Sequence, residues 1–277
     1  GSAGWDLVQR RFTLADPTSA SPGLASLGTP WAFVHSCTIP TFPDRCRDRC
    51  SGRLGRVLSA LLDLVLPVDC GGCGLPGAAL CAECTLSLGQ AIRVYPPSCE
   101  AGPPVYALGT YQGRLRSALL AYKERGRRDL AAPLGAALSC ALLHMDPRPG
   151  GIWLVPVPSR RTAAARRGGQ HVELLVARAA EALAEAGVTT AVAPALRMGP
   201  GVRDSVGLAA AARQANLAGR VWPRRAGLPP AGTPVVLVDD VVTTGATVAA
   251  CATALLRTGI VVPAIVVLAA AGCHTPS

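Results

Sequence analysis

The sequence predicts an α/β fold, in which helices cover a parallel sheet, preceded by a small cysteine-rich module. Short apolar runs alternate with longer Ala- and Leu-rich segments after residue 101, and this order is typical of a parallel sheet with helical crossovers. The run Val235–Val238 contains no polar residue, as expected of a strand that is covered on both faces. Two Cys-x-x-Cys pairs lie between residues 70 and 84 and indicate the separate module.

The 277-residue chain is long enough for one sizeable core and a small module. Residues 1–55 mix Ser, Pro, Gly and charged residues without a sustained period, so we expect a disordered or poorly ordered extension there. Residues 56–100 are expected to form a helix, over 57–66, and the cysteine module. Residues 101–277 are expected to form the α/β domain.

The α/β domain is expected to begin with a strand over 105–111, because this segment is apolar and follows two prolines. Apolar runs predict further strands at 152–157, 189–193, 235–238 and 260–271. Helical spacing of Ala and Leu predicts helices at 114–124, 130–144, 172–186 and 246–257. In such sheets, ligands bind at the carboxyl ends of the strands.

The cysteine module contains Cys70-Gly-Gly-Cys73 and, seven residues later, Cys81-Ala-Glu-Cys84. Two such pairs can grip one ion tetrahedrally, and thiolates select zinc over harder ions. Four protein ligands leave no open coordination position, so we expect a structural Zn²⁺. A redox dithiol and an iron–sulfur site are the alternatives.

Two adjacent acids, Asp239 and Asp240, follow the strand at 235–238, and Thr243-Thr-Gly-Ala-Thr247 leads from them into the last helix. Gly245 permits a tight turn. A turn of small residues at a helix N-terminus directs free N–H groups and threonine hydroxyls at one spot, which suits a phosphate dianion.

The formal net charge is +10, from 27 basic and 17 acidic residues. Lys123 is the only lysine and Asn216 the only asparagine, which makes a chemical requirement at these positions more credible. No apolar run reaches membrane-spanning length, since the longest, residues 260–271, is short and contains Pro263. No signal-peptide core is present. We therefore expect a cytoplasmic protein without membrane insertion.

The segment from Val235 to Thr247 resembles the 5-phosphoribosyl diphosphate (PRPP) binding motif of type I phosphoribosyltransferases. The resemblance implies a Rossmann-like fold of that type. It also implies that Asp239 and Asp240 face the ribose hydroxyls, and that the phosphate is bound by Thr243, Thr244, Gly245, Ala246 and Thr247. The alternative is an ordinary strand, turn and helix of a Rossmann-like domain, in which the acids only cap a helix.

The cysteine module, the segment Val155-Pro-Val-Pro-Ser-Arg160 and the terminal motif together resemble the ComF family of competence-associated proteins, from about Leu58 to Leu268. In that family, a Tyr-x-Gly-x-Leu-Arg segment leads to a lysine. Here the segment is Tyr111–Arg116, and the lysine after it is Lys123. The resemblance implies a role for Lys123, whereas a solvated charge at a helix end is the alternative. It also implies that Arg160 and Arg161 contact pyrophosphate.

The family pattern R-G-F-N-Q is matched only at Arg167 and Gly168, and the chain departs from it at Gly169, Gln170 and His171. We interpret His171 as a surface histidine, with a loop acid or base as the alternative. Later, Arg197 and the segment 213–216 match, whereas Asp204 stands in place of the usual glutamine. Cys99 lacks a Cys-x-x-Cys partner and is interpreted as a bystander or a replacement ligand.

The resemblance implies transfer of the 5-phosphoribosyl group from PRPP to an unidentified nitrogen nucleophile, with release of pyrophosphate and with Mg²⁺ bridging the oxygens. The catalytic residues would be Asp239, Asp240, Lys123 and Arg160. PRPP would also contact Arg167.

The alternative function is a competence or DNA-uptake accessory factor that binds PRPP, or a related phosphate ligand, without turnover. Single-stranded DNA and a competence helicase are its partners in this hypothesis. Residues 56–277 carry 21 bases and 13 acids, enough to contact phosphate backbones if the bases cluster. The plausible patch consists of Arg125, Arg127, Arg128, Arg160, Arg161, Arg166 and Arg167. A solvated surface together with PRPP contacts explains the same arginines.

Overall fold

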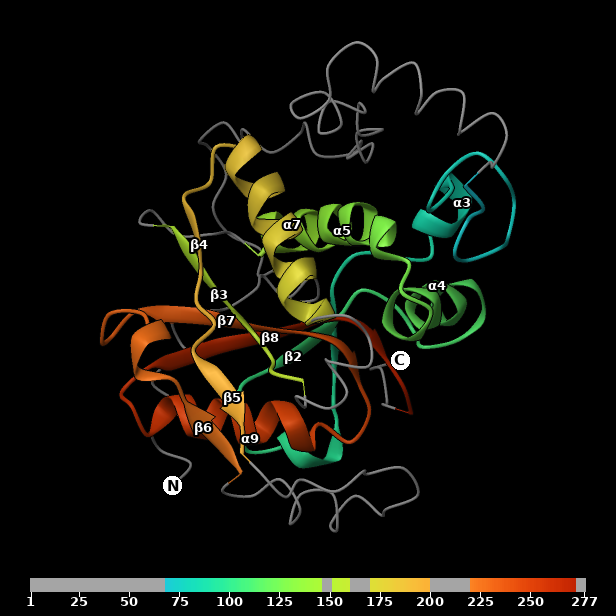
Figure 1. Ribbon diagram of the computed structural model, residues 1–277. Coiled ribbons are helices and arrows are strands. Elements are labelled where there is room, and N and C mark those ends of the chain that lie inside the picture. The colour runs from blue at the N-terminus through green and yellow to red at the C-terminus, as the bar shows by residue number, and fades with distance from the viewer. Residues whose placement is uncertain (1–67, 146–150, 160–169, 200–219, 273–277) are drawn as a thin grey trace, which may run out of the picture.

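The computed structural model describes residues 68–145, 151–159, 170–199 and 220–272, shown in colour in Figure 1. A six-stranded sheet has the order β1-β2-β8-β7-β3-β4. Its strands are β1 (Ile92–Val94), β2 (Val105–Ala107), β3 (Ile152–Pro156), β4 (Thr190–Val192), β7 (Pro234–Val242) and β8 (Val261–Ala270). All neighbouring pairs are parallel except β1 and β2. The predicted α/β fold with a mainly parallel sheet is therefore confirmed.

Helices cover both faces of this sheet (Figure 1). One apolar cluster joins Val236 and Val238 of β7 to buried residues of α4 (Gly113–Glu124), α5 (Ala131–His144) and α7 (His171–Glu185). A second cluster joins Val235 and Leu237 to α9 (Ala246–Leu256) on the other face. Successive residues of a strand point to opposite faces, so β7 is apolar throughout its first half because both faces are covered.

The helices α5 and α7 pack closely because α5 has a glycine where they meet. A Cβ atom on Gly135 would lie 2.7 Å from Cβ of Arg178 and 2.9 Å from the backbone N of Ala179. Glycine in a helix interior costs roughly 0.5–1 kcal/mol relative to alanine. Close packing of α5 against the middle of α7 therefore explains why residue 135 is a glycine.

The cysteine segment is packed against the α/β core. Cys70, Leu80, Cys84 and Leu88 belong to the same apolar cluster as α4 and α5. The short helix α3 (Ala82–Thr85) carries the last of the four cysteines. The expected helix at 57–66 and the extension over 1–55 lie outside the described residues, and the domain boundaries at 55 and 100 stay predictions.

Strand β1 and a two-stranded antiparallel sheet were not predicted from the sequence. This small sheet pairs β5 (Leu196–Met198) with β6 (Val221–Pro223), and it lies on the α9 side, since Leu196 and Val221 join the second cluster. Three 3₁₀ turns complete the described structure: η2 (Pro97–Cys99), η3 (Arg128–Leu130) and η4 (Arg225–Gly227). Among the described helices, none has the length and apolar character needed to cross a membrane.

Candidate functional site

The candidate site lies at the carboxyl end of β7. This strand extends beyond the predicted 235–238 and includes both acids, Asp239 and Asp240. The chain then turns through Gly245, which has φ 80° and precedes the first residue of α9. A left-handed residue of this kind is readily accommodated only by glycine. The turn therefore places the N-terminus of an eleven-residue helix directly after the acid pair.

The N-terminus of α9 is uncapped by side chains. A long contact of 3.5 Å joins the Ala246 N–H to Oγ1 of Thr244. The first N–H groups of a helix have no intrahelical acceptor, and the helix dipole favours an anion beside them. Thr243 is exposed, whereas Thr244 and Thr247 are half-buried. This turn has the donors that a phosphate requires.

The 3₁₀ turn η2, which precedes β2, packs against this turn. The Ser98 N–H donates to the Thr244 carbonyl over 2.9 Å, and Sγ of Cys99 lies 3.6 Å from the Gly245 carbonyl oxygen. A Cβ atom on Gly245 would lie 2.5 Å from Sγ of Cys99 and 2.8 Å from Cβ of Pro96. Gly245 is thus required by its φ angle and by the packing of Pro96 and Cys99.

Asp240 is a buried acid with two side-chain partners, Lys123 and His171. Its Oδ2 atom is 2.8 Å from Nζ of Lys123 and 2.9 Å from Nε2 of His171. Its Oδ1 atom accepts the Val241 N–H over 2.7 Å. The Asp240 side chain is 5% exposed and that of His171 8%. Lys123 comes from the last turn of α4 and His171 from the first residue of α7, so two helices supply the partners of one strand acid.

The two acids differ in their electrostatic surroundings. Burial would raise the pKa of Asp240, but the positive charge of Lys123 and the hydrogen bond from His171 hold that pKa well below its usual range. For Asp239, burial and then the negative charge of Asp240 raise the pKa well above its usual value. Asp239 accepts the Asp240 N–H at Oδ1 over 2.9 Å. The structure therefore keeps Asp240 ionised and makes Asp239 the acid that takes up a proton first.

Tyr122 fixes His171 from the neighbouring helix. Its hydroxyl donates to the His171 carbonyl oxygen over 2.5 Å, and the two rings meet edge to face with centroids 6.0 Å apart. Burial, and then the charge of Asp240, raises the pKa of Tyr122, so the phenol stays protonated as a donor. The interpretation of His171 as a surface histidine is wrong, because its side chain is buried between Asp240 and the Tyr122 ring.

Gln170 also makes a specific contact, although the residues at 170 and 171 depart from the ComF pattern. Its Oε1 atom accepts the hydroxyl of Ser159 over 2.6 Å and the Ser159 N–H over 3.2 Å. Ser159 follows β3 and the Pro-Val-Pro segment. Gln170 and His171 thus join the loop after β3 to the acid pair at the end of β7.

Among the predicted site residues, Lys123, Asp239, Asp240 and the turn 243–247 lie at one edge of the sheet. Lys123 pairs with a buried carboxylate and is not a solvated charge at a helix end. The predicted pyrophosphate contacts Arg160, Arg161 and Arg167 lie outside the described residues, as do Asp204 and the segment 213–216. Their roles stay predictions.

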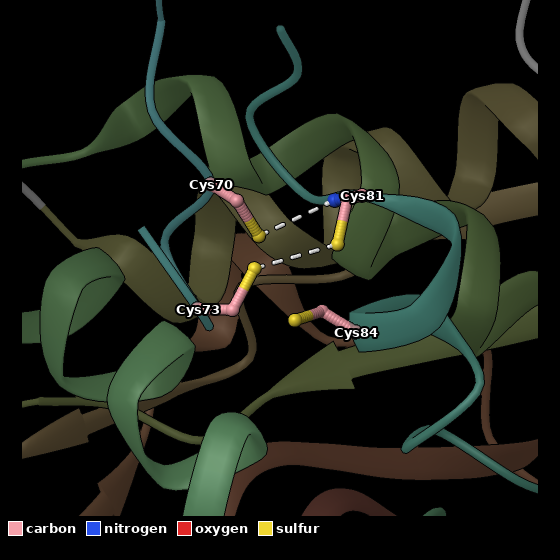
Figure 2. Close-up of side chains that lie close together, drawn as sticks. All are labelled: Cys70, Cys73, Cys81 and Cys84. Atoms are coloured by element: carbon pink, nitrogen blue, oxygen red, sulfur yellow. Dashed lines mark hydrogen bonds between the residues drawn. The ribbon is translucent and has the colours of Figure 1, made fainter. Parts of the chain in front are cut away.

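The cysteine module forms a second site (Figure 2). The four Sγ atoms of Cys70, Cys73, Cys81 and Cys84 all lie within 4.8 Å of one another, and the side chains point toward a common centre (Figure 2). Sγ of Cys73 is 3.6 Å from that of Cys81. All four are free cysteines. This geometry can hold one metal ion, and four sulfur donors fit a soft metal such as zinc.

Backbone N–H groups tune the cluster. Burial alone would raise the pKa of Cys70, but N–H groups of Cys73, Cys81 and Gly72 lower it to about 6. Burial and the neighbouring thiols raise the pKa of Cys84. Gly72 is required here, because its Cβ would lie 2.7 Å from Sγ of Cys84. Cys99 is outside this group and contacts the turn at Gly245 instead, so it is not a replacement ligand.

Fold and site together define a mixed α/β protein with a candidate anion site at the end of β7 and a separate four-cysteine cluster. No protein-family model and no curated protein matches the chain.

Two solved structures similar to this fold are adenine phosphoribosyltransferases. The first is 15% identical, with a TM-score of 0.34, and the match covers 68% of this chain and 89% of that enzyme. The second, from Thermoanaerobacter pseudethanolicus, is 18% identical, with a TM-score of 0.31, and the match covers 68% of this chain and 86% of that one.

Proposed function

We propose that this chain binds PRPP at the carboxyl end of β7 and transfers its 5-phosphoribosyl group to a nitrogen nucleophile, releasing pyrophosphate. One observation carries the proposal: an acid pair and a glycine turn with an uncapped helix N-terminus follow one another at the end of a central strand. Phosphate at the turn places the attached ribose next to Asp239. The resemblance of this motif to type I phosphoribosyltransferases, and of the wider chain to the ComF family, supports the same ligand.

The residues of the site suit this reaction, because its transition state carries positive charge on the ribose. A carboxylate beside the sugar stabilises that charge, and positioning supplies much of the remaining rate enhancement. Mg²⁺, when bound with PRPP, would neutralise the departing pyrophosphate. In our proposal, Asp239 binds the ribose and Mg²⁺, Thr243 to Thr247 bind the phosphate, and Arg160, Arg161 and Arg167 bind pyrophosphate.

Pyrophosphate release tests the enzymatic proposal. The protein is incubated with PRPP and Mg²⁺ and a panel of nucleobases, amines and ammonia, and pyrophosphate is measured by a coupled assay. We expect release that depends on one class of acceptor and that is lost in the Asp239→Asn variant. The proposal would be contradicted if the wild type released pyrophosphate equally with and without an acceptor, and no faster than the Asp239→Asn variant.

A second candidate function is a DNA-uptake accessory factor that binds PRPP without turnover. It is favoured by the side-chain contacts of Asp240, because an acid already held by Lys123 and His171 is a poor candidate for direct contact with the reacting ribose. This candidate predicts PRPP binding with no pyrophosphate release for any acceptor. It also predicts binding of single-stranded DNA that weakens steeply with salt, or binding of a helicase partner.

For the cysteine cluster we propose a structural Zn²⁺. Four thiolate ligands leave no coordination position for a substrate. The cluster lies in the same apolar core as α4, the helix that supplies Lys123. Zinc would thus stabilise the packing of α4 and take no part in the transfer reaction.

A further inference from the structure

We propose that the two acids of this site have different roles, in which Asp239 contacts the ligand and His171 is a positioning residue that holds Asp240 away from it. The inference rests on the proposed function and specifies the contacts within the same site. It replaces the expectation that both acids face the ribose equally.

The first step is the hydrogen-bonding capacity of Asp240. An ionised carboxylate accepts about four hydrogen bonds. Asp240 already accepts three, from Lys123 and His171 at Oδ2 and from the Val241 N–H at Oδ1. Its side chain is only 5% exposed. Direct contact of Asp240 with two ribose hydroxyls would require one of these three contacts to break, which is unfavourable for a buried carboxylate.

Asp239 has the opposite properties. It is more exposed than Asp240, and in the described part of the chain its backbone donor is the Asp240 N–H, at Oδ1. Its remaining capacity is available to ribose hydroxyls or to Mg²⁺, which prefers carboxylate oxygens. Because the Asp240 N–H orients the Asp239 carboxylate, a change in the position of Asp240 would also displace Asp239.

His171 is the residue that fixes Asp240 from the α7 side. Its Nε2 atom is 2.9 Å from Oδ2 of Asp240. Its Nδ1 atom is buried and has no hydrogen-bond partner among the described residues. A ring protonated on both nitrogens would leave a buried N–H donor unpaired, which is costly. We therefore assign the neutral tautomer with hydrogen on Nε2, donating to Asp240.

The orientation of the ring is set by its surroundings. Tyr122 holds the His171 carbonyl by a hydrogen bond and contacts the ring edge to face. Tyr122 is also the residue before Lys123, the second donor to Asp240. Two consecutive residues of α4 and the first residue of α7 thus jointly position Asp240. Among the described residues, the side chain of His171 has no other partner.

The first experiment compares single variants by calorimetry with PRPP and Mg²⁺. Asp239→Asn is expected to weaken binding at least a hundredfold, whereas Asp240→Asn weakens it about tenfold. His171→Phe, which keeps a ring but removes the donor, should match Asp240→Asn. His171→Gln, which restores an N–H donor, should recover part of the loss. Circular dichroism verifies that each variant is folded.

A double-mutant cycle tests whether His171 acts through Asp240. The effect of His171→Phe should disappear in the Asp240→Asn background. An Asp240→Asn variant that loses as much affinity as Asp239→Asn, or additive effects of His171→Phe and Asp240→Asn, would overturn the division of roles. Failure of the wild type to bind PRPP is a different result, because it overturns the proposed function itself.

Nitrogen-15 NMR of the histidine side chains tests the pairing without any ligand. The wild type is expected to show one ring with a protonated Nε2 and an unprotonated Nδ1, assigned to His171 by its loss in His171→Gln. In Asp240→Asn this ring should become a mixture of tautomers. A protonated Nδ1 in the wild type, or a ring unaffected by Asp240→Asn, would overturn the role of His171.

Discussion

The acid pair of β7 places two negative charges on consecutive residues and gives only one of them a close cation. Lys123 and His171 both contact Asp240, whereas among the described residues Asp239 accepts the Asp240 N–H and has no close cation of its own. The pKa of Asp240 is therefore held low and that of Asp239 is raised. A raised carboxyl pKa means that ionised Asp239 destabilises the folded state. Such a cost agrees with our proposal that Asp239 is kept for ligand binding.

Asp239→Asn is accordingly predicted to raise the melting temperature at neutral pH while it removes ligand binding. A gain of about 1 kcal/mol would raise Tm by about 2–4 °C in a domain of this size. The control is Asp129→Asn, which removes an exposed acid paired with Arg127 and should change stability by less than about 0.5 kcal/mol. Differential scanning fluorimetry measures both.

The gain in stability expected for Asp239→Asn depends on pH. Because the folded-state pKa of Asp239 is raised, wild-type stability falls as pH rises from about 3.9, the usual carboxyl value, through the raised pKa. The advantage of Asp239→Asn should therefore grow as the pH rises through the raised pKa of Asp239 and should shrink as the pH is lowered toward 4. An advantage that grows on acidification, or a lower Tm at neutral pH, contradicts the electrostatic account.

At the residue scale, the sequence singled out Lys123 and the acid pair, of which the structure brings Lys123 and Asp240 into contact, whereas His171 was misassigned. A signal for it existed. In a parallel α/β sheet, the helix that follows a strand begins at the carboxyl edge, so a polar residue at the start of the predicted helix 172–186 lies near residues that follow other strands. The contact with Asp240 could not be predicted, because it depends on the packing of α4 against α7.

Among the elements, the cysteine segment and α4 form one packed unit. Cys70 and Cys84 are buried in the apolar cluster that includes Leu115 and Leu119 of α4. Gly71 packs against Leu130, since an added Cβ would lie 2.7 Å from its Cδ1 atom. A metal held by the four sulfurs would therefore fix the position of the helix that carries Lys123.

The double variant Cys70→Ser/Cys73→Ser is predicted to lose one equivalent of zinc and to melt at a lower temperature than the wild type. Removing a structural metal or its ligands from a small module commonly destabilises it by several kcal/mol. Elemental analysis and thermal melting measure the two effects. Cys140→Ser, in α5 and outside the cluster, is the control and should keep the metal. A folded wild type that carries no metal would exclude the zinc site.

Helices with a strong hydrophobic period were predicted accurately, whereas short strands were not. The helices α4, α5, α7 and α9 begin and end within a residue of the predicted bounds. The strand expected over 105–111 ends at Ala107, because the chain at Gly109 approaches Ser87 so closely that a Cβ would lie 2.7 Å from its carbonyl oxygen. The strands β5 and β6 have three residues each and form only through pairing between distant segments, which leaves no local pattern.

At the scale of the whole molecule, the topology brings together residues that are far apart in sequence. Strands β3, β7 and β8 are parallel neighbours, so their carboxyl ends share one edge of the sheet (Figure 1). The end of α4 and the start of α7 reach the same edge. The alternation of strands and helices predicted a ligand site at this edge, whereas the sheet order that places β7 centrally is a tertiary property.

Calorimetric titration with PRPP and Mg²⁺ tests the central claim most directly. It compares the wild type, the double variant Asp239→Asn/Asp240→Asn and a control variant, Asp129→Asn. The control also replaces an Asp by Asn, but at a site away from β7. We predict that the wild type and Asp129→Asn bind PRPP with the same affinity and that the double variant shows no binding. Equal binding by all three proteins, or no binding by the wild type, would contradict the assignment of the site at the end of β7.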